Sequence, residues 1–174
     1  MTNWTMDAVH SEVRFKIKHL MISTVTGHFD TFSGKMTASQ PDFSDANISF
    51  EADVKSINTN NEQRDGHLQN DDFFDAINNP KLTFVSSSIS KRSDDEYALG
   101  GDLTIRGITK PVTLNVSYTG TAKDLAGVDT AGFEITGKVN RKEFGLKFDA
   151  LTETGGIALG DEVKLEIITE MKKS

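Results

Sequence analysis

The stretch Val13-Arg14-Phe15-Lys16-Ile17-Lys18 decides the fold of this chain, because apolar and charged residues strictly alternate along it. Successive side chains of a β-strand point to opposite faces of the sheet, so the alternation creates one apolar face and one polar face. The same pattern returns in about eight blocks of the 174 residues. Eight such strands closed on themselves would form a barrel with an apolar interior about wide enough for one small ligand.

The alternating blocks predict an all-β fold, an eight-stranded antiparallel barrel. The expected strands are Ser11–His19, Gly27–Met36, Asn47–Ser56, Leu82–Ser90, Tyr97–Ile105, Val112–Val116, Gly132–Arg141 and Glu162–Met171. Within the second strand Phe29 and Phe32 differ in parity, so a β-bulge is needed to bring both to one face. Leu20 to Thr24 breaks the alternation and is compatible with a short turn of helix.

A short helical insertion is expected between the third and fourth strands. Residues 59–79 lack alternation and are rich in Asn and Asp. Thr59 or Asn60 is a suitable cap for a first helix ending at Leu68, and Asp71 is a suitable cap for a second. The second helix would carry three apolar residues along one side, Phe73, Phe74 and Ile77.

Length and charge narrow the function classes. A chain of 174 residues and 19.1 kDa is expected to form one domain, residues 1–174. The net charge of −7 argues against nucleic acid as a partner and disfavours an anionic membrane surface, and it favours solubility. No cysteine is present, and the first residues lack the features of a secretory signal. No apolar run approaches the ~20 residues of a membrane helix. We therefore expect a cytoplasmic protein.

Catalytic and metal-binding motifs are absent from the sequence. The histidines His10, His19, His28 and His67 have no metal-ligand spacing, so no metal site is predicted. There is no Gly-x-Ser-x-Gly elbow, phosphate-binding loop or Ser/His/Asp arrangement. We predict no catalytic residue, no cofactor and no enzymatic activity. His19 is in phase with the inward residues Phe15 and Ile17, and two interpretations stay open: a hydrogen-bonded structural histidine or a contact with a ligand head group.

The segment Arg64-Asp65-Gly66-His67-Leu68 is the densest polar cluster next to apolar residues. One interpretation is an Arg64–carboxylate pair that fixes the helical insertion to the barrel. The alternative is that Arg64 or His67 meets an anionic or polar end of a ligand. Phe73 and Phe74 likewise either pack as core or gate the cavity. The alternation alone also leaves open whether the interior holds a ligand or is filled by its own side chains.

Motifs along nearly the whole chain resemble the YceI-like family of lipocalin-like proteins. They include Asp7-Ala8-Val9-His10-Ser11, Phe15-Lys16-Ile17-Lys18-His19-Leu20, Gly27-x-Phe29-x-x-Phe32-x-Gly34, Asp53-x-x-Ser56-Ile57-x-Thr59, Arg64-Asp65-x-His67-Leu68, Asp72-Phe73-Phe74-Asp75, Pro80-x-Leu82-x-Phe84 and Gly101-x-Leu103 through Val112. The resemblance implies a lipocalin-like barrel that binds, stores or carries a polyisoprenoid, an isoprenoid quinone or a similar long-chain amphiphile. Many members of the family carry a secretory leader, and this chain departs from that pattern. Similar proteins often pair as homodimers, and no feature of this sequence decides that question.

The predicted function is therefore lipid binding and transport in the barrel, with the isoprenoid-type lipid as the bound ligand. The alternatives are a plugged barrel that serves as a structural or interaction module, and an enzyme that modifies a lipid through His19 or His67. The predicted ligand contacts combine the inward apolar residues with the polar motif positions. They are Phe15, Ile17, His19, Phe29, Phe32, Met36, Ile48, Phe50, Arg64, His67, Phe73, Phe74, Phe84, Leu99, Leu103, Phe133 and Ile135; Ile105 also belongs to the inward set.

Overall fold

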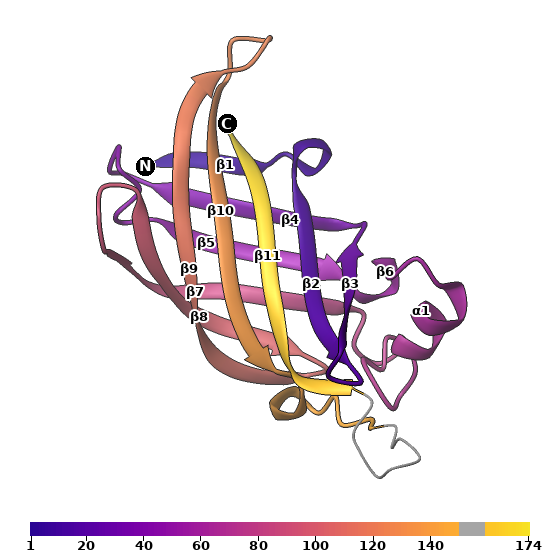
Figure 1. Ribbon diagram of the computed structural model, residues 1–174. Helices are drawn as coiled ribbons and strands as arrows, with labels where there is room; N and C mark the ends of the chain where they lie inside the picture. The colour runs from indigo at the N-terminus through magenta and orange to yellow at the C-terminus, as the bar shows by residue number, and fades with distance from the viewer. Residues whose placement is uncertain (150–158) are drawn as a thin grey trace.

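In the computed structural model, which describes residues 1–149 and 159–174, eight antiparallel strands close into a barrel (Figure 1). In ring order the strands are β1 (Thr2–Met6), β4 (Phe32–Ala38), β5 (Asn47–Asp53), β7 (Lys81–Lys91), β8 (Glu96–Ile105), β9 (Ile108–Lys123), β10 (Asp129–Asn140) and β11 (Leu159–Lys173). Pairing of β1 with β11 closes the ring. The predicted antiparallel barrel is confirmed.

A branch of three strands lengthens the barrel at one end. It consists of β2 (Glu12–His19), β3 (Ser23–Phe29) and β6 (Ile57–Asn58). The same edge of β11 pairs with β1 at Met171 and beyond, and with β2 from Leu159 to Ile168. One long strand thus serves both the closed ring and the branch. The short elements are the helix α1 (Glu62–Leu68) and the 3-10 helices η1 (Ala8–His10), η2 (Val54–Ser56) and η3 (Arg141–Phe144).

Five local predictions need correction. The N-terminal strand β1 was not predicted, and the expected strand Gly27–Met36 is two strands, β3 and β4. The strand is interrupted between them at Asp30 and Thr31. There the amide of Asp30 donates to the carbonyl of Ser56, and the carbonyl of Thr31 accepts from the amide of Asp53. This break, rather than a bulge within one strand, resets the alternation between Phe29 and Phe32. The expected strand Val112–Val116 extends over the whole of β9.

The other two corrections concern helices. Leu20 to Thr24 forms a β-turn and the start of β3 instead of a turn of helix. The first predicted helix is present as α1, although its cap is Asn61, whose side chain accepts the amide of Arg64 at 3.0 Å. The second predicted helix is absent from the described residues, because residues 69–79 fold into successive turns. The described part of the chain contains no helix long and apolar enough to cross a membrane.

The connection between β4 and β5 closes one end of the barrel. Phe43 in this connection is 4% exposed and packs against the rings of Trp4, Tyr118 and Phe133, with centroids 5.3–5.4 Å apart. Hydrogen bonds from Ser44, and one from Lys91, lower the pKa of the neighbouring Asp42 to about 2. A charged carboxylate therefore holds this connection in place at neutral pH.

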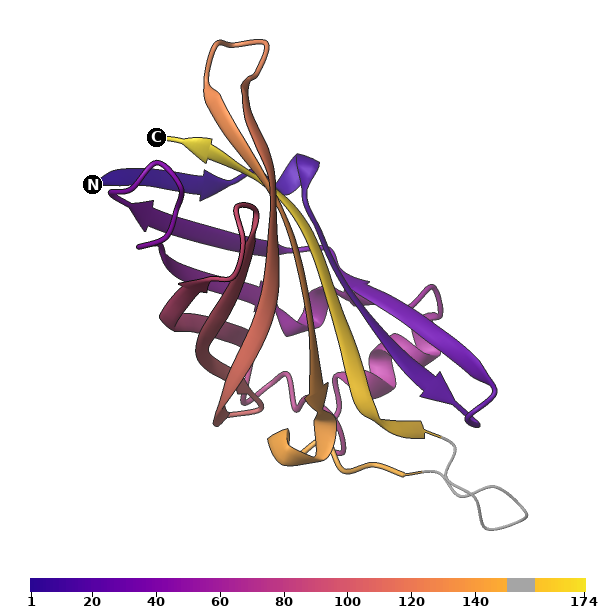
Figure 2. The same ribbon diagram turned by 60° about the vertical axis from the view of Figure 1, so that its left-hand side comes forward.

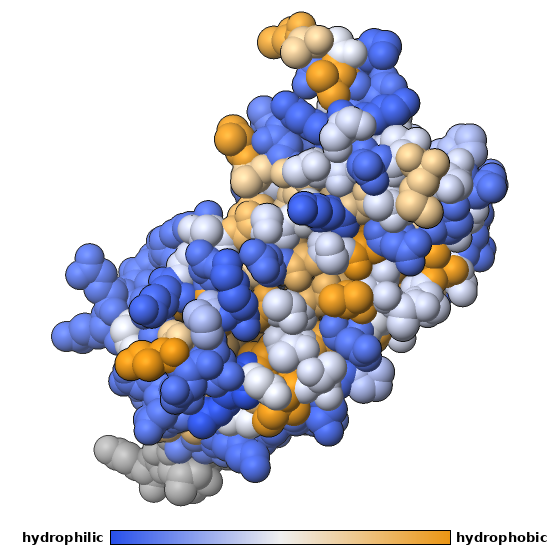
Figure 3. Space-filling view, turned by 180° about the vertical axis from the view of Figure 1, so that it is seen from behind, coloured by the Kyte–Doolittle hydropathy of each residue, from blue (hydrophilic) through white to orange (hydrophobic). Residues whose placement is uncertain are grey.

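At the opposite end of the barrel, short helices and a hairpin surround an opening. Figures 1 and 2 show α1, η3 and the β2–β3 hairpin at this end, and the β9–β10 hairpin at the other. The outer surface seen from behind is mainly hydrophilic, with smaller apolar patches (Figure 3). The two ends of the barrel therefore differ. Aromatic side chains around Phe43 fill one end, and short helices and a hairpin surround the other.

Candidate functional site: an apolar cavity series

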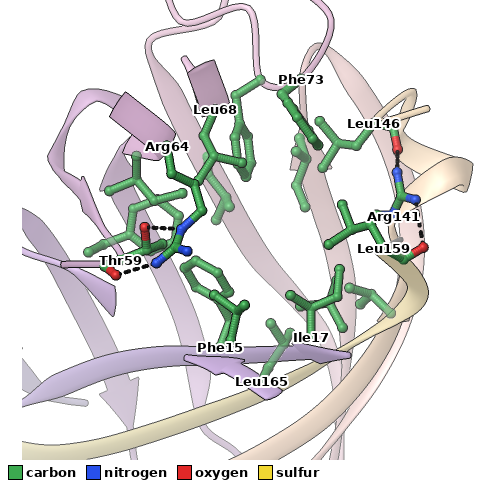
Figure 4. Close-up of a pocket in the computed structure, with 18 of the residues that line it drawn as sticks. Phe15, Ile17, Thr59, Arg64, Leu68, Phe73, Arg141, Leu146, Leu159 and Leu165 are labelled. Atoms are coloured by element: carbon green, nitrogen blue, oxygen red, sulfur yellow. Dashed lines mark hydrogen bonds between the residues drawn. The ribbon is translucent and has the colours of Figure 1, made fainter. Parts of the chain in front are cut away.

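Three cavities follow one another through the barrel interior. The first, at the open end, has a volume of about 230 Å³ (Figure 4). A middle cavity of about 120 Å³ and an inner cavity of about 70 Å³ lie beyond it. Neighbouring cavities share walls: Phe15, Phe29 and Leu165 line the first and middle cavities, and Ile48, Phe50 and Ile135 line the middle and inner ones. We call this arrangement the cavity series.

The strand β11 shows why the series is apolar and long. Its inward positions contribute to all three cavities in turn: Val163, Leu165, Ile167, Thr169 and Met171. Eight residue steps separate the first and last of these, which corresponds to ~26 Å along a strand that rises ~3.3 Å per residue. The intervening residues point outward. The alternation in the sequence therefore creates an elongated apolar lining rather than a compact pocket.

Two arginines interrupt the apolar wall of the first cavity. Arg64 projects from α1, and its Nε and Nη2 atoms donate to the hydroxyl and carbonyl oxygens of Thr59 at 2.7 and 2.6 Å (Figure 4). Asp65 accepts from the amide and hydroxyl of the same threonine at 2.8 and 2.5 Å. No carboxylate lies within 4.0 Å of the Arg64 guanidinium among the described residues, so the Arg64–carboxylate pair considered as one interpretation is not found in that part of the chain.

Arg141 is bound quite differently. Its side chain is 2% exposed and donates to the carbonyls of Leu146, Phe148 and Gly160 at 2.6–2.8 Å and to the carboxylate of Asp149 at 2.6 Å. Hydrogen bonds from Lys142 and Arg141 lower the pKa of Asp149, so the carboxylate is charged. The Arg141 charge is thus neutralised and its donors are used. This arginine holds the chain segments around the opening together.

Most predicted ligand contacts lie on the cavity walls. His19, Arg64, Phe73 and Phe74 line the first cavity, together with Phe15, Ile17 and Phe29. Phe73 is 6% exposed, so it packs as part of the core while it lines the cavity. The middle and inner cavities are lined by the other predicted apolar residues, Met36, Ile48, Phe50, Phe84, Leu99, Leu103, Phe133 and Ile135, with Ile105 shared by the first and middle cavities.

Two predicted contacts lie outside the series. Phe32 stands next to the break between β3 and β4, where its ring centroid is 6.4 Å from that of Phe50. His67 bonds through Nε2 to Asp72 at 2.6 Å and packs edge-on against Phe73. His67 therefore joins α1 to the turns that follow it, which is a structural role.

Several wall residues were missed by the sequence-based prediction. Val163 and Leu165 belong to a recognised alternating block and could have been included on parity alone. Arg141 gave no such signal, because a charged residue at the end of a strand is normally exposed. Its burial depends on carbonyl groups from segments that follow it in the chain.

One cluster of possible metal ligands lies away from the cavities. Suitable atoms of Asp7, His10 and Glu170 lie within 4.8 Å of one another. His10 bonds to Asp7 at 2.8 Å, and the ammonium of Lys172 lies 3.2 Å from the same carboxylate. The hydrogen bond from His10, followed by that from Lys172, lowers the pKa of Asp7. The cluster is therefore explained by ion pairing.

Comparison with known sequences gives consistent matches across the whole chain. The model of a family described as the YceI-like domain matches residues 4–171. UPF0312 proteins from Staphylococcus aureus strains USA300 and NCTC 8325 are each 42% identical over 175 residues, which cover 100% of this chain and 99% of theirs.

Solved structures share the same architecture. The YCEI protein of Campylobacter jejuni is 32% identical, with 90% of each chain covered and a TM-score of 0.77. BcnA of Burkholderia cenocepacia is 24% identical and has a TM-score of 0.83, with 95% of this chain and 98% of BcnA covered. A polyisoprenoid-binding domain from Saccharophagus degradans has a TM-score of 0.68 at 15% identity, with 98% of each chain covered. The last two likenesses concern the fold alone.

Proposed function

This chain belongs to the YceI-like family, and from its cavity series we propose that it binds a polyisoprenoid or a similar long-chain amphiphilic lipid without altering it chemically. The observation that carries the proposal is the succession of three apolar cavities along one barrel axis. A compact ligand would need one wide pocket, whereas a linear tail can occupy cavities placed end to end. The fold neighbour named as a polyisoprenoid-binding domain supports the same ligand class.

The apolar wall would supply most of the affinity. Each methylene that leaves water gains ~0.8 kcal/mol, so a tail with many carbons can offset the cost of association. The narrow inner cavities favour a single unbranched or regularly methylated chain. The polar groups at the opening would then select among head groups.

We expect the protein to retain its lipid during purification. Native mass spectrometry and solvent extraction of freshly purified protein should reveal one class of long-chain molecule in close to one-to-one ratio. After delipidation, the protein should rebind an added polyprenol. A ligand-free protein that ignores polyprenols and other long chains would favour the plugged barrel instead, and turnover of the lipid would favour an enzyme.

Arg64 is the group that we assign to the head group of the lipid. Two of its nitrogens are occupied by Thr59, while no hydrogen bond within the described residues uses Nη1. Its positive charge at the edge of an apolar cavity favours a carboxylate or phosphate over a neutral hydroxyl. The neutralised Arg141 offers no comparable charge.

Replacing Arg64 by glutamine should therefore weaken the binding of lipids with an anionic head group more than the binding of lipids with a neutral one. For a long-chain fatty acid we expect ~10- to 100-fold weaker binding, because a charge-assisted hydrogen bond is lost. For the alcohol of the same chain length the dissociation constant should hardly change. Titration of delipidated protein would measure both constants, with Arg64→Lys as the conservative control. An equal loss for acid and alcohol would contradict the assignment.

A further inference from the structure

We propose that the tip of the β2–β3 hairpin, Leu20-Met21-Ile22, inserts into the surface of an anionic lipid bilayer. It would thereby hold the opening of the barrel against the membrane from which the lipid is taken. The inference extends the proposed function and rests on it for the identity of the cargo. The membrane contact itself is carried by separate observations on this hairpin.

The first observation is exposure. Leu20, Met21 and Ile22 are 39%, 70% and 83% exposed, and they are consecutive. The remaining exposed large apolar residues of the described chain occur singly: Met1, Val9, Ile77, Val85, Leu125 and Ile168. Isolated exposed apolar residues are common on proteins, whereas a contiguous group marks a contact surface.

The second observation is the backbone at the tip. The amide of Ile22 donates to the carbonyl of His19 at 3.2 Å, so Leu20 and Met21 are the central residues of a β-turn. Both have positive φ angles, 53° and 58°. This turn favours Asn-Gly, and large apolar side chains are strained there. Folding therefore does not require leucine and methionine at the tip, which points to a role outside the fold.

The third observation is the position of the tip. The strands of the hairpin place His19 and Val25 on the wall of the first cavity. The tip continues from this wall into solvent, at the end of the barrel that carries α1 and η3 (Figure 2). A tail that leaves the first cavity along this wall would reach the three apolar side chains directly.

Local charge complements an anionic surface. Met21 shares a hollow of about 390 Å³ on the outer surface with Lys16, Lys18 and Lys164. Lys16 pairs with Glu166 at 3.5 Å, while Lys18 and Lys164 have no carboxylate within 4.0 Å among the described residues. The acidic residues of the hollow are engaged elsewhere, Asp161 with Lys142 at 3.3 Å and Glu162 with Lys138 at 4.0 Å.

These features favour a bilayer over a protein as the partner. A three-residue loop buries far less than the ~1,000 Å² of a specific protein interface. Apolar side chains flanked by lysines are, however, sufficient for interfacial insertion into a membrane that contains anionic lipid. The net charge of −7 opposes attachment by other faces, so the hairpin would also fix the orientation of the barrel.

The test compares the parent with the triple variant Leu20→Asn, Met21→Gly and Ile22→Ser in co-sedimentation with phosphatidylcholine–phosphatidylglycerol vesicles. We expect the variant to bind vesicles at least ~10-fold more weakly, because three apolar side chains no longer insert. Its thermal midpoint should equal or exceed that of the parent, since Asn-Gly fits the turn. Lys18→Gln and Lys164→Gln should each lower binding by roughly fivefold, and only on vesicles with the anionic lipid.

A matched control comes from the other end of the barrel. Leu125, at the tip of the β9–β10 hairpin, is fully exposed, and Leu125→Ser should leave vesicle binding unchanged. Equal binding by the parent and the triple variant would overturn the proposal, as would a parent that does not bind vesicles. A parent dimer that becomes a monomer in the variant, without vesicle binding in either, would assign the tip to a second copy of the chain and also overturn it.

A vesicle-free measurement separates this inference from the proposed function. The triple variant should capture a water-dispersed fluorescent fatty acid as the parent does, because the cavity walls are intact. If the parent captures no long-chain probe but binds vesicles through the hairpin, the proposed function fails and the membrane contact stands. If capture is normal and vesicle binding is absent, only the membrane contact fails.

Discussion

Replacing Ile135 by tryptophan is expected to weaken the binding of long chains about 100-fold and to leave the binding of short chains intact. Ile135 lies on β10 and lines both the middle and the inner cavity. A tryptophan at this junction would fill the passage between them. If about four methylenes are denied access to the inner cavity, binding should weaken by ~3 kcal/mol, or ~100-fold. A chain short enough for the first cavity alone should bind as before.

The measurement is a pair of dissociation constants, for long and short fatty acids, on delipidated protein. Ile168→Trp on the adjacent strand is the matched control, because Ile168 is 38% exposed and belongs to the outer face. Overpacking at Ile135 should lower the free energy of unfolding by only ~1–3 kcal/mol, which urea denaturation would check. If long and short chains lose affinity equally, the three cavities do not act as one binding site.

The single tryptophan of the chain offers an independent readout in the parent protein. Trp4 is 7% exposed and packs against Phe43, which lines the inner cavity. Long chains that reach the inner cavity should change the emission of Trp4, and short chains should not. The same titrations therefore report how deep the tail penetrates.

Of the variants proposed here, Arg141→Met should lower the free energy of unfolding most, by about 3–5 kcal/mol. The variant would leave the carboxylate of Asp149 and several loop carbonyls without the buried donor that now satisfies them. Urea denaturation at neutral pH would measure the free energy of unfolding. Arg141→Lys should recover only part of the loss, because an ammonium cannot reproduce the planar geometry of the guanidinium.

The control for this prediction is Lys142→Met. Lys142 shares the Asp149 carboxylate at 2.8 Å, but its side chain is one-third exposed, so its removal should cost far less. If Arg141→Met were as stable as Lys142→Met, the guanidinium would contribute no more than an exposed ion pair. The assignment of Arg141 as the residue that holds the opening together would then be wrong.

Several features of the site were accessible from the sequence because they depend on local geometry. The alternation around Phe15 and Ile17 determines which side chains share a face, and both line the first cavity. The helix-capping signal at Thr59 or Asn60 located the start of α1 to within two residues, since the cap is Asn61. The same reasoning was wrong for Leu20 and Met21, because a turn with two left-handed residues leaves no periodic signal and normally contains glycine or asparagine.

By itself, then, the sequence determined the all-β fold, the antiparallel barrel and the inward parity of most cavity residues, because the two-residue period is a property of each strand. Only the tertiary structure decided that β1 closes the ring, that Phe43 plugs one end and that Arg141 is buried at the other. Each of these depends on contacts between segments distant in the chain or brought together by loops. Such contacts follow from how the strands pack, and no local pattern of residues encodes them.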